Sequence, residues 1–495
     1  TNTFTGDQVI NSVNVGKGAN SVASNTVLGV NALDAAVTGE NNVAIGNVAM
    51  TDATSADDST AVGAGTLNAL TTGNANTALG KSALLLNTTG SSNTALGKDA
   101  LRANTTASNN TAVGIDALTA NTTGTQNVAV GAFALDANTT ANDNTACGYN
   151  SLSVNTTGAN NVAVGSFALD ANTTASNNSA IGVAALSENT TGGENSAVGA
   201  FALDANSTGA NNTAFGVAAL GANTTASNNT AIGRSALEVN TTGAYNTALG
   251  IYSLDANTTA SENTAIGSFA LTNNTTGSTN TAVGYNSMGD NSTGANNTAV
   301  GMRSLKSNTT ASNNSAFGYH ALEENTTGGS NTAVGTTALD ANVNGNNNTA
   351  IGNNALSSST SASQNTSVGS SSLDSVTTGV SNVAVGFVAG GGLTTGNYNI
   401  AIGQESLAAT STASRNTAVG HEALKANTTG DSNVALGSNA LQQNTTGGNN
   451  VGIGKQALDA NTTASNNTAV GFAALLKNTT GTLNSAVGAN ALDAC

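Results

Sequence analysis

Apolar and polar residues recur along the chain with a period of 17 residues. A glycine stands at Gly29, Gly46 and Gly63 and then at every seventeenth residue up to Gly488, which makes 28 repeat glycines with no insertion or deletion between them. The residue before each glycine is apolar, with Cys147 as the one unusual member. Asn stands four residues before the glycine in 27 of the 28 repeats, and Leu stands four residues after it in 25. A disordered chain has no reason to keep this register, so the pattern predicts a folded repeat protein.

The elements within one repeat are short. In residues 110–127, an extended segment "NTAVG" is followed by an "AL" pair and then by the polar turn "NTTG". A helix is disfavoured, because Asn, Thr and Gly are weak helix formers and occur in every repeat. Short extended segments joined by turns favour strands, and identical positions then lie about 4.8 Å apart on successive turns. The predicted fold class is all-β, a parallel β-solenoid (β-roll) of about 28 turns with a 17-residue repeat.

The fixed positions have predicted roles in building this stack. Two apolar columns, one before and one after the repeat glycine, are expected to face inward, and the glycine lies where the chain bends or a backbone approaches closely. The fixed alanine two residues before the glycine marks a tight place, which we interpret as a contact with a neighbouring chain. Asparagine above asparagine is expected to form a ladder of side-chain amides. The structural positions of two example repeats are Asn110, Ala112, Val113, Gly114, Leu118, Asn121, Asn127, Val130, Gly131, Leu135 and Asn138.

Small variations between repeats recur at two or three times the basic period. Alanine replaces the turn glycine at intervals of 34 or 51 residues, as at Ala107 and Ala141, and "FALDAN" begins at Phe133, Phe167 and Phe201. We interpret these spacings as duplications of blocks of two and three repeats. A structural period of two or three turns is the alternative.

The repeat divides the chain into two regions. Residues 1–24 form an N-terminal lead-in segment with a degenerate repeat, and residues 25–495 form a shaft that stops within a repeat at Cys495. The chain starts at Thr1 without a methionine, which indicates a fragment or a processed chain with flanking domains missing. No apolar stretch approaches the roughly 18 residues of a membrane helix, and no signal peptide is visible, so no membrane span is predicted.

Charge is scarce in this composition. Only 8% of the residues are charged, against roughly 25% in typical soluble proteins. The formal net charge of −16 argues against nucleic acid as a partner, because phosphate binding needs clustered Lys and Arg. We interpret the acidity as a contribution to solubility, with the binding of cations or of a basic partner as the alternative. Many repeats carry no charge and bury roughly two large side chains each, so neutral faces are expected to pack against further copies of the chain.

Three segments carry a resemblance to known repeat families. "NSVNVG" at residues 11–16, "NNVAIG" at residues 41–46 and "NSAVG" at residues 195–199 resemble the head repeats of trimeric autotransporter adhesins, which are left-handed parallel β-rolls of three packed chains. The period of 17 residues is longer than that of those heads. The longer form, "NTAVG…AL…NTTG…N", more closely resembles repeat regions of phage tail fibres. The resemblance implies a left-handed homotrimeric shaft, or an adhesive fibre, whose receptor-binding tip lies outside this repeat region.

Candidates for catalysis and metal binding are few. His320 and His421 are the only histidines and lie about six repeats apart, so neither a catalytic triad nor a metal cluster is expected. The chain is therefore predicted not to be an enzyme and to need no cofactor. Asp136, Asp170 and Asp204 recur in alternate repeats, and we favour a solvated edge over a Ca²⁺ site, because the chain contains no calcium-loop motif.

The cysteines and the glycosylation sequons have simple interpretations. Cys147 replaces an apolar residue of a supposedly inward column and is expected to be a buried, inert thiol. Cys495 stands where other repeats have Asn, and its role stays open. Asn-Thr-Thr and Asn-Asn-Thr triplets match the N-glycosylation sequon, but the ladder and the turn require the same residues, so modification is not expected.

Aromatic side chains occupy the two variable positions after the repeat glycine. If these positions are exposed, the rings are able to stack on sugars, and if they face another chain, the rings are interface packing. We favour packing. The residues concerned are Phe133, Phe167, Phe201, Phe269, Tyr149, Tyr285 and Tyr319.

The predicted function is structural. The chain is expected to be the extracellular shaft of a phage tail fibre or of a similar appendage, which holds a host-binding end away from a particle or cell. Its expected partners are two further copies of itself and, through missing flanking domains, a host receptor or glycan. An adhesin whose rod surface binds glycans is the alternative. An ice-binding solenoid is a weaker one, because regular Thr-x-Thr columns are not maintained.

Overall fold

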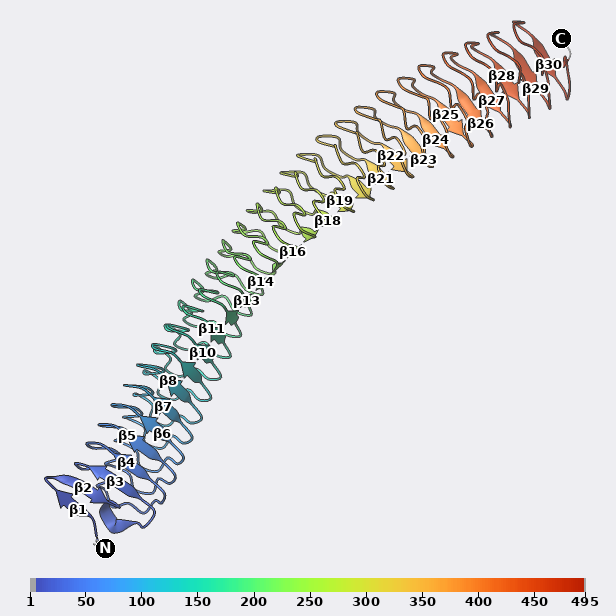
Figure 1. Cartoon of the computed structure of the whole chain (residues 1–495). Helices are drawn as coiled ribbons and strands as arrows, with labels where there is room; N and C mark the ends of the chain where they lie inside the picture. The colour runs from blue at the N-terminus through green and yellow to red at the C-terminus, as the bar shows by residue number, and fades with distance from the viewer. Residues whose placement is uncertain (1–5, 494–495) are drawn as a thin grey trace. The chain divides into compact units, whose positions relative to one another are not determined.

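The structure of the protein is a computed structural model that describes residues 6–493. The chain divides into two compact units, Thr1–Asn246 and Thr247–Cys495. Both units are all-β, and each is a parallel β-solenoid in which one turn takes up 17 residues, as the sequence predicts. Together the units contain about 27 turns, and each turn contributes one short strand (Figure 1).

The strands are almost all three residues long. Those of the first unit are β1 (Gln8–Ile10), β2 (Val13–Gly16), β3 (Thr26–Gly29), β4 (Val43–Ile45), β5 (Thr60–Val62), β6 (Thr77–Leu79), β7 (Thr94–Leu96), β8 (Thr111–Val113), β9 (Val128–Val130), β10 (Thr145–Cys147), β11 (Val162–Val164), β12 (Ser179–Ile181), β13 (Ser196–Val198), β14 (Thr213–Phe215) and β15 (Thr230–Ile232). Those of the second unit are β16 (Thr247–Leu249), β17 (Thr264–Ile266), β18 (Thr281–Val283), β19 (Thr298–Val300), β20 (Ser315–Phe317), β21 (Thr332–Val334), β22 (Thr349–Ile351), β23 (Thr366–Val368), β24 (Val383–Val385), β25 (Ile400–Ile402), β26 (Thr417–Val419), β27 (Val434–Leu436), β28 (Val451–Ile453), β29 (Thr468–Val470) and β30 (Ser485–Val487).

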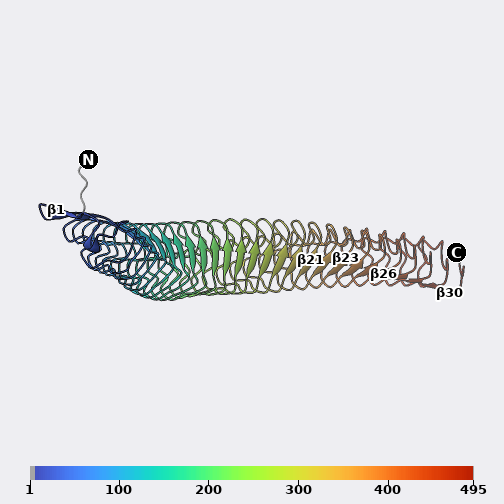
Figure 2. The same ribbon diagram turned by 90° about the horizontal axis from the view of Figure 1, so that it is seen from below.

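Within each unit, successive strands pair in parallel with a register of one repeat. Ala112 of β8 lies opposite Ala129 of β9, and Ala299 of β19 lies opposite Ala316 of β20. The turns of a unit therefore overlie one another, as Figure 2 shows from below. Residues at the same position of successive repeats form columns along each unit. The residue type kept at one position of the repeat therefore decides the character of one whole side of the stack.

The lead-in segment folds differently from a solenoid turn. β1 and β2 pair antiparallel, and β2 pairs antiparallel with β3, the first strand of the stack. A short 3₁₀ helix, η1 (Ala19–Ser21), connects β2 to β3. The hairpin covers a strand edge that would otherwise be open to pairing with another chain, which is a common way for repeat proteins to close a stack.

The core of a turn is built from an alanine and a leucine. Ala112 and Leu118 are completely buried, and so are Ala129 and Leu135 in the next turn. The fixed alanine thus packs inside its own chain, and the prediction that it marks a contact with a neighbouring chain is wrong. At Gly452, which replaces this alanine, an added Cβ would lie 3.3 Å from Cδ1 of Leu441. The interior has room for little more than a methyl group here.

The predicted inward column before the repeat glycine faces outward instead. Val113 is half-buried, and Val130 is 36% exposed. Side chains alternate between the two faces of a strand, so only the central residue of each three-residue strand points inward. Because the small alanine takes that central place, both of its neighbours point away from the core. This correction decides which face of the solenoid is apolar.

The repeat glycine is required by its conformation and by its surroundings. Gly114 has a φ of 138°, and a Cβ added there would lie 2.4 Å from the carbonyl oxygen of Gly131 on the next turn. Three other residues of the same turn also have positive φ, namely Asp116 at 54°, Leu118 at 53° and Gln126 at 60°. A non-glycine residue in this left-handed region costs roughly 1–2 kcal/mol. The backbone hydrogen bonds between turns offset this cost: the N–H of Leu118 donates to the carbonyl of Ala134 at 2.9 Å.

Two columns of buried asparagine hold the turns together. In the strand-asparagine column, four residues before the glycine, the N–H of Asn127 donates to Oδ1 of Asn110 at 2.9 Å, while Nδ2 of Asn110 donates to the carbonyl of Gly124 at 2.9 Å. In the turn-asparagine column, seven residues after the glycine, Nδ2 of Asn138 donates to Oδ1 of Asn121 at 3.0 Å. The continuous ladder of side-chain amides runs in this second column, whereas the first column is linked mainly through backbone N–H groups.

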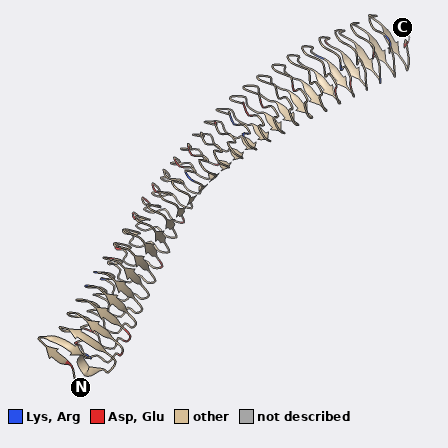
Figure 3. Cartoon of the chain, viewed as in Figure 1, with Lys and Arg blue, Asp and Glu red and all other residues tan. Residues whose placement is uncertain are grey.

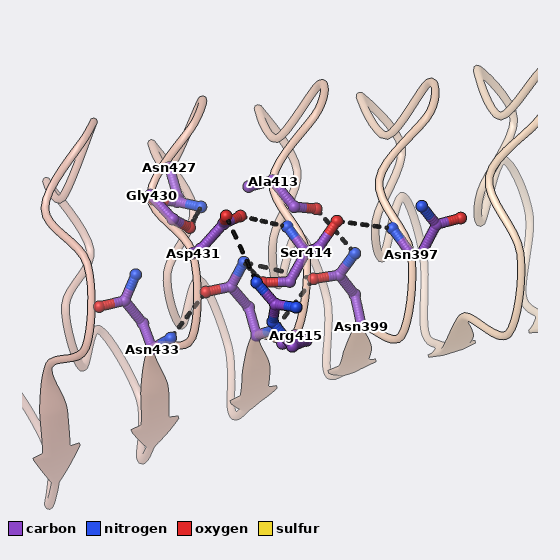
Figure 4. Close-up of polar contacts among 10 residues, drawn as sticks. Asn397, Asn399, Ala413, Ser414, Arg415, Asn427, Gly430, Asp431 and Asn433 are labelled. Carbon is purple, nitrogen blue, oxygen red and sulfur yellow. Dashed lines mark hydrogen bonds and ion pairs between the residues drawn. The ribbon is translucent and has the colours of Figure 1, made fainter.

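Figure 4 shows the same bonding in the second unit. Nδ2 of Asn399 donates to the carbonyl of Ala413 at 2.9 Å, as the equivalent asparagine does in most turns. A third column lies on the rim, where the N–H of Asn397 donates to Oγ of Ser414 and the N–H of Ser414 donates to Oδ1 of Asp431 at 2.7 Å. Each turn thus satisfies its polar backbone through side chains of its neighbours, which lets a coil with little apolar core remain ordered.

Candidate functional site

The outward column before the repeat glycine, here called the outer column, is the longest chemical feature of the surface. Its members are apolar in every repeat except that of Cys147, although they are exposed or half-buried, for example 56% exposed at Phe215 and 77% at Val487. Exposed members include Leu28, Leu79, Val130, Val164, Ile181, Phe215 and Ile232 in the first unit, and Leu249, Ile266, Phe317, Val334, Ile351, Val385, Ile402 and Leu436 in the second. A free surface tolerates polar residues at such places, so an apolar residue kept in this row is unusual for exposed surface.

Cys147 belongs to the outer column and is therefore exposed. The prediction of a buried, inert thiol is wrong for the same reason as the prediction for Val113, because both rested on an inward column. Cys495 lies outside the described residues.

The aromatic positions lie beside the outer column and form two short runs. In the first unit, the ring centroids of Phe133 and Tyr149 are 6.1 Å apart, and those of Tyr149 and Phe167 are 5.4 Å apart, both edge to face. Phe201, which lies two repeats after Phe167, is 49% exposed. The rings touch one another along the stack yet keep one side open to solvent.

The second run has the same design in the second unit. The centroids of Tyr252 and Phe269 are 5.7 Å apart in a stacked arrangement, and those of Phe269 and Tyr285 are 6.0 Å apart, edge to face. Tyr319 lies further along, with its ring 3.8 Å from that of His320. Tyr285 and Tyr319 are both about half exposed.

Carboxylates accompany the aromatic residues in alternate turns of the first unit. Asp136, Asp170 and Asp204 are half-buried rather than fully solvated, contrary to the expectation of a solvated edge. Burial raises the pKa of all three above the ordinary value for aspartate. Oδ1 of Asp136 is buried and has no hydrogen-bond partner among the described residues. All three carboxylates are thus partly desolvated, and one oxygen of Asp136 lacks a compensating hydrogen bond.

A groove opens beside two of these aspartates. One groove of about 390 Å³ is lined by Phe133, Asp136, Ala137, Tyr149, Asn150, Ser153 and Val154. Another of about 390 Å³ is lined by Phe201, Asp204, Ala218, Gly221, Ala222, Glu238 and Val239. Each groove lies between two successive turns. The first turn carries an aromatic residue and an aspartate, and the second carries a small residue, Ser153 or Gly221, at the position of that aspartate.

Two clusters of paired charged groups lie in the second unit, and other charged residues are scattered along both units (Figure 3). In the first cluster, Arg303 pairs with the buried Glu323 at 2.7 Å, and Nδ1 of His320 also contacts Glu323. In the second, Nζ of Lys425 lies 2.5 Å from Glu405 and 2.6 Å from Glu422.

Lys425 sets the charge balance of the second cluster. Its hydrogen bonds lower the pKa of Glu405 and of Glu422, and the two carboxylates in turn raise the pKa of Lys425. His421 lies beside Glu422, so the two histidines belong to separate clusters, as their spacing predicts. The pairs of the second cluster are largely exposed and contribute little to stability, whereas the first cluster is built around the buried Glu323 and leaves Nε of Arg303 and Nε2 of His320 without a hydrogen-bond partner among the described residues.

The sequon asparagines divide by burial. Asn121 and Asn138, which begin Asn-Thr-Thr triplets, are completely buried in the amide ladder. Asn109, which begins an Asn-Asn-Thr triplet, is exposed. Folding therefore hides the first class of sequon and leaves the second class on the surface.

Residues 6–493 contain no group of three or more His, Cys, Asp or Glu side chains placed to hold a metal ion. The same residues contain no helix of the length and apolar character needed to cross a membrane.

Comparison with known proteins gives no match, either to a family model or to a curated sequence. The function must therefore be argued from the surface. Sequence reasoning found the aromatic residues and the aspartates but treated them separately. It missed the grooves, although their signal was present in the alternation of "FALDAN" with repeats that carry a small residue in place of Asp.

Proposed function

We propose that this protein is the shaft of an extracellular fibre, such as a phage tail fibre or a similar appendage, and that it works as a left-handed homotrimer. The observation that carries the proposal is the outer column, which is exposed or half-buried in one chain and yet is apolar in every repeat except that of Cys147. In this role the shaft holds a host-binding end away from a particle or cell.

The chemistry of the outer column favours further copies of the same chain as its partner. A partner that covers the column must present apolar groups with the same axial period, and another copy of the solenoid has that period by construction. Sheets pack face to face about 10 Å apart, which suits side chains of the size of Val, Ile and Leu. The column itself carries no charge, so the net charge of −16 does not act directly across such a contact.

The interior supports a structural role. The fixed residues of the repeat form the glycine bend, the Ala and Leu core and the asparagine columns. Repeats of this kind add length without adding a new site. The ice-binding alternative is disfavoured, because the first threonine of each turn is used internally: Oγ1 of Thr122 donates to the carbonyl of Thr139 at 3.0 Å.

Mass measurement tests self-association. Sedimentation equilibrium of the full chain is expected to give three times the monomer mass of 47.8 kDa. Val130→Lys combined with Val164→Lys places two charges in the outer column and is expected to shift the protein towards monomer. Thr157→Lys with Thr174→Lys, at exposed positions on another side of the turn, is the matched control and should leave the mass unchanged. A wild-type monomer contradicts the trimer.

Location tests the biological role. Antibody labelling of intact particles and cells of the source, viewed by electron microscopy, is expected to mark thin surface fibres along their length. Label that stays inside cells, with no extracellular fibre marked, contradicts the proposal.

A further inference from the structure

The grooves of the first unit, whose aromatic residues lie beside the outer column, suggest a second activity. The groove beside Asp136 has Phe133 and Tyr149 as aromatic walls, with Asn150 and Ser153 completing its lining. These side chains offer aromatic surface, amide and hydroxyl groups and one carboxylate within about 390 Å³. Small-molecule sites combine apolar walls with a few polar groups in this way.

The arrangement recurs along the unit. Phe167 with Asp170, and Phe201 with Asp204, occupy the same positions of their turns as Phe133 with Asp136. The turns that follow them carry Ser187 and Gly221 at the position of the aspartate. Since successive turns lie about 4.8 Å apart, these units repeat roughly every 10 Å along the axis. Such spacing suits a chain-like ligand whose own repeat is two rings long.

We propose that this face of the first unit binds a neutral polysaccharide, with sugar rings stacked on Phe133, Phe167 and Phe201 and with sugar hydroxyls donating hydrogen bonds to Asp136, Asp170 and Asp204. The step of two turns matches a disaccharide unit. This activity lies beyond the shaft role and does not depend on it.

The state of the carboxylates favours a ligand that donates hydrogen bonds. Oδ1 of Asp136 is buried without a partner among the described residues, so its group loses hydration that the protein does not replace. A hydroxyl in the groove supplies that missing donor. An anionic ligand would meet three carboxylates and is disfavoured. A cationic ligand is the competing occupant, because aromatic faces also attract ammonium groups.

The second unit contains a closed version of the same motif. Tyr252 and Asp255 have the spacing of Phe133 and Asp136, but the next turn carries Thr272. Oγ1 of Thr272 donates to Oδ1 of Asp255 at 2.6 Å and also contacts the carbonyl of Tyr252 at 2.9 Å. The threonine thus supplies within the protein the kind of donor that Oδ1 of Asp136 lacks. This contrast provides the design of the test.

The test titrates the full chain with two neutral probes, cellohexaose and chitohexaose, by isothermal calorimetry, with hexalysine as the cationic probe. Wild type is expected to bind at least one hexasaccharide and not hexalysine. The triple change Phe133→Ala, Phe167→Ala and Phe201→Ala should weaken binding at least tenfold, because it removes all three aromatic surfaces on which the sugar rings stack. Phe269→Ala in the second unit is the control and should leave binding unchanged.

A closing variant separates the site from stability. Ser153→Thr, Ser187→Thr and Gly221→Thr copy Thr272 and should abolish binding while the circular dichroism spectrum and the melting curve stay as in wild type. A Cβ at Gly221 would lie 3.4 Å from its nearest neighbours, an ordinary contact, so the change is tolerated. Failure of both hexasaccharides to bind wild type, binding of hexalysine instead, or full binding by the closing variant each overturns the proposal. The mass of the assembly is measured in a separate experiment, so a failure of the shaft proposal is distinguishable from a failure of polysaccharide binding.

Discussion

Two regions of the molecule differ in the residues that occupy the turn-asparagine column. In the first unit, Asn87 to Asn240 form an unbroken column in which each side-chain amide donates to the asparagine of the preceding turn. In the second unit, the column stops at Asn342, four turns carry Ser359, Val376, Leu393 and Thr410, and it resumes at Asn427. All four replacements are completely buried.

The interrupted region leaves polar atoms without partners at its two ends. Oδ1 of Asn342, Oγ of Ser359 and Oγ1 of Thr410 are buried and have no hydrogen-bond partner within the described chain. A fully satisfied polar network stabilises a core, whereas its cut ends cost desolvation energy. The ladder is therefore cooperative, and its interruption is expected to make residues 342–427 easier to open than the turns from Asn87 to Asn240.

The interrupted region also shows how the core compensates. Gly390 stands where other turns have the core leucine, and Leu393 stands where they have the turn asparagine. A Cβ added at Gly390 would lie 2.7 Å from Cδ2 of Leu373 and 3.4 Å from Cδ1 of Leu393. Leu393 thus fills the space that the missing leucine leaves. The turn keeps its core volume because its leucine stands three residues later in the repeat.

The largest expected effect comes from cutting the intact column. Asn155→Val copies Val376 but leaves Oδ1 of Asn138 without its donor, which lies at 3.2 Å, and Nδ2 of Asn172 without its acceptor at 2.9 Å. We expect a local loss of about 3 kcal/mol. Hydrogen exchange by mass spectrometry should show faster exchange in the turns around residue 155. Thr157→Val, at an exposed position, is the control. Equal exchange in the two variants contradicts a cooperative ladder.

A somewhat smaller effect is expected from overfilling the compensated turn. Gly390→Leu alone should destabilise the region by about 2 kcal/mol, because two leucines then compete for one space. Combining it with Leu393→Asn restores the common pattern of the repeat and should recover most of the loss. A double-mutant cycle followed by hydrogen exchange measures the coupling. Additive effects of the two changes would show that Leu393 does not occupy the leucine space.

Extending the ladder should stabilise the interrupted region by about 1 kcal/mol. In Ser359→Asn, the new Nδ2 is placed to donate to the unpartnered Oδ1 of Asn342. Slower exchange is expected in residues 342–362. Ser358→Asn, one residue earlier and exposed, is the control. Faster exchange in Ser359→Asn would mean that the missing partner is not the weakness of this region.

The smallest effect should be the same in both regions. Tyr245 and Tyr398 have φ values of 59° and 60° and are 63% and 62% exposed, far from the ladder position. Asn tolerates the left-handed region better than Tyr, so Tyr245→Asn and Tyr398→Asn should each stabilise their turn by about 0.5 kcal/mol. Local exchange rates measure both. Clearly unequal effects would show that the two regions differ beyond the ladder.

The period of the sequence predicted much of this fold because a strict repeat leaves few alternatives. The 17-residue turn, the parallel stacking, the glycine bend and the inward Leu118 all follow from the register of fixed residues. The grooves did not follow, because they depend on which residues meet across turns. Phe133 and Asp136 belong to one repeat and Ser153 to the next, and only stacking brings the small Ser153 beside the aspartate.

The direction of the strand residues was decided by the tertiary structure. The sequence by itself determined that Ala112 and Val113 are fixed in type, but two neighbouring residues of a strand point to opposite sides, and apolar character favours the larger one for the core. The width of the turn reverses that preference. Leu118 and the buried asparagines fill the interior and leave room for a methyl group, so the alanine faces inward and the valine faces out. The repeat determined the length and the spacing, and packing within the turn determined the face that the protein presents.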